Sequence, residues 1–140
     1  MKTWLVSWVL LPIAAIGQQP VTWEMLQEVE IDYRQDSTHN IWELLPVYSD
    51  EILALDGMEI QITGFVIPVS LATNEFVLSA FPFASCFFCG GAGPESVVAI
   101  YPKKKIQLQT DELRSFSGRL SIYKRSDGLL YQLENARLHP

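Results

Sequence analysis

The chain has 140 residues, of which 49% are hydrophobic, and its formal net charge is −6. This length is enough for one domain with one modest core, and it excludes two independent cores. The excess of acidic residues excludes a general attraction to phosphate backbones, so nucleic acid is not an expected partner.

The first seventeen residues read as an export signal. Lys2 supplies a positive start, and the apolar stretch that follows ends in small residues. Ala15 and Gly17 suit the two small positions before a signal-peptidase cut, which would leave Gln18 as the new N-terminus. The stretch is too short for a comfortable membrane span. We therefore expect an exported protein that is not an integral membrane protein after cleavage; an uncleaved N-terminal anchor is the alternative.

Cleavage would make the mature chain more acidic. It removes one of the ten basic residues and none of the sixteen acidic ones, so the net charge becomes −7. Cysteines in an exported chain meet oxidising conditions, which changes what a close cysteine pair can mean.

Residues 18–57 are expected to form an N-terminal extension that packs on the main domain. Thr22 can cap a short helix in which Trp23 and Leu26 lie on an apolar side. A polar stretch, DSTHN, then interrupts the apolar pattern, and residues 41–57 resume it. The sequence predicts one short helix and irregular segments here.

Residues 58–140 read as a β domain. The segment 58–70 alternates apolar and polar residues at Ile60 and Ile62, and the alternation slips at Gly64. A glycine at such a slip predicts a bulge that lets a long strand bend. Four further runs are typical of strands: residues 74–81, 95–101, 118–125 and 129–138.

Five strands with a bent first strand predict a closed barrel. The last two strands are joined by Ser126-Asp127-Gly128, a good hairpin turn. The predicted fold class is mainly β, a small OB-like Greek-key β-barrel of five strands with a short helical N-terminal extension. Residues 109–116 would form the short helix that plugs such a barrel. An open sandwich is the alternative.

The two cysteines of the chain lie close together in the segment SCFFCGGAGPES, residues 85–96. Thiolates at the spacing of Cys86 and Cys89 can hold one metal ion together, but they supply only half of a tetrahedral zinc site. Glu95 is the nearest acid in sequence, and His139 could approach if the last strand runs beside the loop. Two chains could instead share one ion, each giving two sulfurs.

Three other interpretations of the pair stay open. An exported protein can close Cys86 and Cys89 into a structural disulfide, although so small a loop contributes little stability. Thiol-disulfide exchange would have Cys86 attack and Cys89 resolve. That chemistry needs a helix beginning at the first cysteine to lower its pKa, and Gly90, Gly91 and Gly93 disfavour one. The third interpretation is that both cysteines are buried and inert.

The glycines and the lysines nearby suggest no cofactor. Gly90, Gly91 and Gly93 could present backbone N–H groups to an anion. They match no phosphate-binding loop or dinucleotide fingerprint, so no nucleotide cofactor is expected. Positive φ angles in a tight crossing loop explain them better. The one basic cluster, residues 103–105, predicts a solvated turn, and two histidines leave few candidates for general-base catalysis.

Three segments together resemble a known group of proteins: LDGMEIQITGFVIPV, FVLSAFPFASCFFCGGAGPESVV and GRLSIYKRSDGLLYQLENARL. They are similar to small exported bacterial proteins of unassigned function that share an OB-like domain. The resemblance covers residues 55–138. Relatives carry a Cys and a His in the loop where this chain has two cysteines, which is what interchangeable soft metal ligands would look like. The resemblance thus implies fold and location more than activity.

The predicted function is a non-enzymatic, periplasmic binding or accessory protein. Its Cys-x-x-Cys loop would hold a transition metal, zinc before others, and its partner would be a protein of the cell envelope. Cys86 and Cys89 would be thiolate ligands, with Glu95 or His139 to complete the site. The alternatives are a thiol-disulfide exchange partner and a structural interaction module with a disulfide-braced loop.

Overall fold

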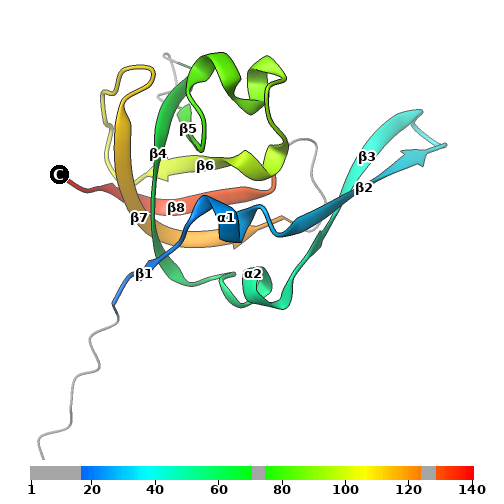
Figure 1. Cartoon of the computed structure of the whole chain (residues 1–140), viewed down its shortest axis with the longest axis horizontal. Coiled ribbons are helices and arrows are strands. Elements are labelled where there is room, and N and C mark those ends of the chain that lie inside the picture. The colour runs from blue at the N-terminus through cyan, green and yellow to red at the C-terminus, as the bar shows by residue number, and fades with distance from the viewer. Residues whose placement is uncertain (1–16, 71–74, 124–128) are drawn as a thin grey trace, which may run out of the picture.

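The computed structural model describes residues 17–70, 75–123 and 129–140 (Figure 1). Its elements in chain order are β1 (Gln19–Pro20), α1 (Trp23–Leu26), β2 (Val29–Asp36), β3 (Ile41–Tyr48), α2 (Asp50–Ala54), β4 (Glu59–Ser70), β5 (Glu75–Ser79), three short 3-10 helices η1 (Phe83–Ser85), η2 (Phe87–Cys89) and η3 (Pro94–Ser96), β6 (Val97–Pro102), β7 (Leu113–Ile122) and β8 (Tyr131–Leu138).

Five of the strands close into a barrel. Their order is β4-β5-β6-β8-β7, and β7 pairs back onto β4. The long strand β4 makes this closure possible, because it pairs with β7 from Glu59 to Phe65 and with β5 from Phe65 to Ser70. β6 and β8 run parallel, and the other neighbours in the barrel are antiparallel. The predicted OB-like barrel is confirmed, and the open sandwich is wrong.

The bulge predicted at Gly64 is wrong. The register between β4 and β7 runs through Gly64 without a break, and the irregularity lies further on, between Pro68 and Ser70 opposite β5. Gly64 is buried, and a Cβ built on it would lie 2.7 Å from the Ser79 carbonyl oxygen and 2.8 Å from Cζ2 of Trp23. Close packing therefore explains this glycine.

The N-terminal elements contribute to the barrel core. The N-cap predicted at Thr22 is confirmed, since its hydroxyl accepts a hydrogen bond from the Met25 N–H at 3.4 Å. Leu26 of α1 and Ile52 of α2 are fully buried in the same hydrophobic cluster as the inward-facing barrel residues. The buried Tyr131 hydroxyl on β8 donates to the Leu26 carbonyl oxygen at 2.7 Å.

The helix predicted for residues 109–116 is wrong. Residue 109 lies in an irregular segment, a turn follows, and β7 begins at Leu113. Phe116 and Leu120 of this strand are completely buried, because pairing with β4 turns alternate side chains into the barrel. The short helices α1 and α2 supply the helical part of the core instead.

The prediction of irregular segments between residues 27 and 48 is also wrong. β2 and β3 form an antiparallel hairpin that pairs Val29 with Tyr48 at its base and Asp36 with Ile41 near its tip. The polar stretch DSTHN makes the turn, where Asp36 accepts a hydrogen bond from the Thr38 N–H at 2.8 Å. Figure 1 shows the hairpin projecting away from the barrel.

Two sequence-based expectations fall on parts of the chain without a description. The predicted signal peptide, residues 1–17, lies outside the described residues apart from Gly17, and so does the turn at residues 126–128. Over the parts that are described, no helix combines the length and apolar character needed to cross a membrane.

Candidate functional site

The two cysteines lie in the connection between β5 and β6, which forms three consecutive single turns of 3-10 helix. Cys86 is the N-cap of η2, and its carbonyl oxygen accepts hydrogen bonds from the N–H groups of Cys89 at 3.1 Å and Gly91 at 3.2 Å. Gly90 ends the turn in the left-handed region, with φ of 75°. A short helix does begin after Cys86, contrary to expectation, but one turn is too short to act like the helix of a dithiol oxidoreductase.

Close packing against backbone requires Gly91, whereas Gly93 lies under the flexible end of a side chain. A Cβ on Gly91 would lie 2.7 Å from the carbonyl oxygen of Ser85. A Cβ on Gly93 would collide with the carboxylate of Glu95, which folds back over it. Of the three glycines Gly90, Gly91 and Gly93, only Gly90 has the positive φ that was predicted for them.

The cysteine side chains are free thiols that lie close together. Cys86 is buried and Cys89 is exposed. Partial desolvation, followed by the hydrogen bond and the charge of Cys86, raises the pKa of the Cys89 thiol above its ordinary value. Among the described residues, no cationic side chain lowers the pKa of Cys89, and residues 75–102 contain no Lys, Arg or His. The Cys89 thiol is therefore protonated at neutral pH.

This asymmetry reverses the roles that a redox mechanism would give the two cysteines. In the mechanism predicted from sequence, Cys86 attacks a partner disulfide. The Cys86 side chain is buried, however, whereas Cys89 faces solvent. The accessible thiol also has a raised pKa, which makes it a poor nucleophile near pH 7.

The predicted completing ligands do not join the cysteines. Glu95 turns back over Gly93 and acts on Tyr131, whose pKa it helps to raise. The Nε2 atom of His139 lies 2.8 Å from the Ser117 hydroxyl at the end of β8, and Figure 1 shows this terminus on the other side of the barrel from the η1–η3 loop. No three His, Cys, Asp or Glu side chains of the described residues could hold a metal ion together.

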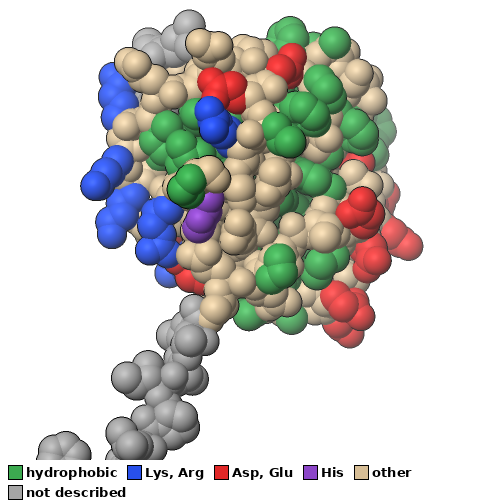
Figure 2. Space-filling model, turned by 60° about the vertical axis from the view of Figure 1, so that its left-hand side comes forward, with side chains coloured by type: hydrophobic (Ala, Val, Ile, Leu, Met, Phe, Trp, Pro, Cys, Tyr) green, Lys and Arg blue, Asp and Glu red, His purple; other side chains and the backbone are tan. Residues whose placement is uncertain are grey.

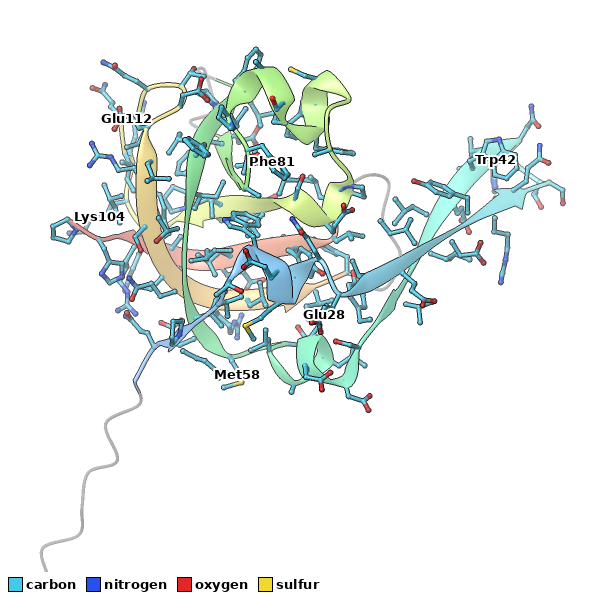
Figure 3. All side chains as sticks on the ribbon, viewed as in Figure 1. Glu28, Trp42, Met58, Phe81, Lys104 and Glu112 are labelled. Atoms are coloured by element: carbon cyan, nitrogen blue, oxygen red, sulfur yellow. The ribbon has the colours of Figure 1, made fainter. Side chains whose placement is uncertain are left out.

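Aromatic side chains accompany the exposed cysteine. Phe81, Phe83 and Phe88 are between 40% and 48% exposed, and Figure 3 labels the first of them at the start of the loop. Phe87 instead packs on the small cluster formed with β4, β5 and β6, and its ring meets that of Phe88 edge-on at 5.3 Å. The exposed rings of Phe81 and Phe83 were not predicted, although the run AFPFASCFF is a signal for them in the sequence.

The raised pKa of Cys89 has a measurable consequence. Iodoacetamide should label Cys89 in the folded, reduced protein more slowly at pH 8 than it labels an unstructured cysteine peptide, because less thiolate is present. The rate should still be rising above pH 9. Mass spectrometry of the labelled protein measures it, and Cys86 should stay unlabelled because it is buried.

Cys86→Ala supplies the control for this measurement. It removes the hydrogen bond and the charge that act on Cys89, so the pKa of Cys89 should move down toward its ordinary value. If iodoacetamide labelled the native protein faster than the peptide at pH 7, the result would contradict the described geometry of the two thiols.

Comparison with known proteins finds a solved structure with a similar fold. No family model and no curated protein matches the chain. A crystal structure of a DUF3299 family protein from Pseudomonas aeruginosa is similar, with a TM-score of 0.55 and 15% sequence identity. The match covers 89% of this chain and 97% of that one. At this identity the likeness establishes the fold alone.

Proposed function

We propose that this is an exported, non-enzymatic accessory protein whose Cys86 and Cys89 form half of a zinc site. The observation that carries the proposal is that two free thiols lie close together on one turn, one of them at the surface. Two thiolates occupy two of the four positions that zinc prefers. The other ligands come from a second molecule, either another copy of this chain or a protein of the cell envelope.

The surroundings of Cys89 suit contact with a second molecule. Exposed phenylalanine rings on the same loop offer apolar area, and aromatic residues are enriched in protein interfaces. Thiols must lose their protons to bind zinc, so the raised pKa of Cys89 makes binding sensitive to acid. Zinc affinity should fall steadily as the pH is lowered from 8 to 6.

Zinc content and thiol content, measured together, test this proposal. Reduced protein from the envelope fraction should begin at Gln18 and hold zinc at one ion per chain or one per two chains. Cys86→Ser and Cys89→Ser should each lower zinc affinity by a factor of about 100 or more, because each removes one thiolate. Competition with a chromophoric chelator gives the affinities.

Two further variants serve as matched controls. Glu95→Gln and His139→Asn change the two residues that were predicted as further metal ligands but that lie away from the thiols. Both should retain zinc at the native affinity. Reduced protein that takes up no zinc would refute the proposal, and loss of zinc in either control would show that the ligand set is different.

A structural disulfide is the second candidate, and the proximity of the two thiols favours it. In an oxidising compartment the pair would close and brace the loop as an interaction surface. An intact disulfide in protein isolated without reductant, with no zinc bound after reduction, would support this function in place of the first. If that disulfide also resists glutathione, a role in thiol-disulfide exchange is excluded.

A further inference from the structure

The hairpin formed by β2 and β3, here called the arm, has one continuous apolar face. Residues paired across an antiparallel ladder point to the same side, so the register assigns the side chains of the arm to two faces. The first face carries Val29, Ile31, Tyr33, Gln35, Trp42, Leu44, Pro46 and Tyr48.

The barrel covers this face at its base and leaves the outer part bare. Val29, Ile31 and Leu44 pack against the main core. Further out, Tyr33 is 58% exposed and Trp42 is 68% exposed. Soluble proteins seldom keep such aromatic rings on a projecting hairpin without a partner. The outer arm is thus an apolar surface that the chain itself does not bury.

The second face of the arm is acidic. Its charged residues are Glu30, Asp32, Asp36 and Glu43 with one basic residue, Arg34. Ile41, Leu45 and Val47 lie among them, and Ile41 and Val47 are exposed. A partner that encloses the arm therefore meets the aromatic rings on one face and an excess of negative charge on the other, so a groove with both apolar and basic lining would suit it.

A groove with the complementary character lies elsewhere on the same chain. It has a volume of about 530 Å³, its apolar lining comes from Ile106, Ala136 and Leu138, and its basic lining from Arg137 and residues 103–105. Figure 2 shows lysine and arginine side chains gathered on one side of the molecule. Arg137 pairs with Glu59 at 2.6 Å, whereas the three lysines are exposed and make no ion pair within the described residues.

The arm cannot reach the groove of its own chain. Figure 3 labels Trp42 and Lys104 at opposite ends of the long axis of the molecule. We propose that the arm of one copy docks in the groove of a second copy, with Tyr33 and Trp42 against the apolar lining and the acidic residues near the lysines. Such a contact joins two different surfaces, so it is heterologous.

Sedimentation velocity at rising protein concentration tests the proposal. A Cys86→Ser/Cys89→Ser background with chelator present removes any association through zinc, so failure here is separate from failure of the proposed function. Protein with the wild-type arm and groove should form dimers or larger species at protein concentrations between about 1 µM and about 1 mM. Association should weaken with added salt.

Variants of each surface should act alone. Tyr33→Ala/Trp42→Ala in the arm and Lys103→Ser/Lys104→Ser in the groove should each weaken association about tenfold or more. Leu53→Ala removes an exposed apolar side chain of α2 as a control for the first. Gln27→Glu/Thr110→Glu gives the same net charge as the second at exposed positions outside the groove. Both controls should associate like the parent.

Mixing the two defective variants identifies the geometry. One still has an intact groove and the other an intact arm, so the mixture should form a 1:1 complex at concentrations where each variant alone stays monomeric. A monomeric parent at every concentration overturns the proposal. So does an arm variant that associates normally, and so does a groove variant that associates normally, because the arm then docks elsewhere. Circular dichroism of each variant confirms that it is folded.

Discussion

Replacing Tyr131 by alanine should lower the free energy of unfolding by about 4 kcal/mol, as expected for an aromatic ring removed from a packed core. The side chain is completely buried on β8. Its hydroxyl donates to the carbonyl oxygen of Leu26 at 2.7 Å, and its ring lies 5.9 Å from that of Tyr48. Burial, and then the charges of Tyr48 and Glu95, raise the pKa of Tyr131, so the hydroxyl remains a donor in alkaline solution.

Tyr131→Phe separates the hydrogen bond from the ring. It keeps the packing but leaves the Leu26 carbonyl without its donor, so we expect a loss of about 1–3 kcal/mol. Urea unfolding followed by circular dichroism measures both variants. Equal losses for Tyr131→Phe and Tyr131→Ala would mean that the ring contributes nothing, contrary to its burial in the core.

Replacing Gly64 by valine should cost about 3 kcal/mol in the free energy of unfolding through overpacking. Valine is among the best strand formers, so propensity alone would predict a gain in this position on β4. A Cβ, however, would meet the backbone oxygen of Ser79 at 2.7 Å and the indole of Trp23 at 2.8 Å. That indole is held in place because its N–H donates to the Thr63 carbonyl oxygen at 2.8 Å.

Gly57→Ala provides the comparison for Gly64→Val. Gly57 has φ of 80° but nothing within 4 Å of an added Cβ, so its loss reflects backbone strain alone, about 1 kcal/mol. Thermal unfolding of both variants under one set of conditions gives the ranking. A smaller loss for Gly64→Val than for Gly57→Ala would show that Trp23 can move aside at little cost and that the strand tolerates the closer approach.

The barrel strands were predictable from the sequence because their alternation is strong. Ile60 and Ile62 mark the inward face of β4, and both are buried as the pattern requires. The role of Gly64 was not predictable, because the indole that lies against it comes from α1, about forty residues earlier in the chain. An apparent slip of phase was in fact a small residue on the inward face.

The errors at residues 109–116 and in the arm have different causes. Acidic and long side chains near Leu113 favour a helix locally, but pairing with β4 and β8 overrides that preference. In the arm, Val29, Ile31 and Tyr33 alternate with charged residues ahead of a polar turn. That is a hairpin pattern, so the arm was predictable from the sequence.

The candidate site was located from sequence, but its asymmetry was not. The spacing of Cys86 and Cys89 predicts that the sulfurs lie near each other. Which one faces solvent depends on how Phe87 anchors the loop in the cluster beneath it. The positions of Glu95 and His139 depend in the same way on the path of the whole chain.

Residues 18–57 and the barrel share one hydrophobic core. This limits how the chain can be divided into domains. Val21, Leu26 and Ile52 fill space inside the cluster that holds the strands, and β1 pairs with β4 in parallel at Gln19 and Ile60. A fragment beginning at Met58 would keep every barrel strand and still expose the apolar surface that these side chains cover. The boundary drawn at residue 57 therefore separates two stretches of sequence that share one hydrophobic core.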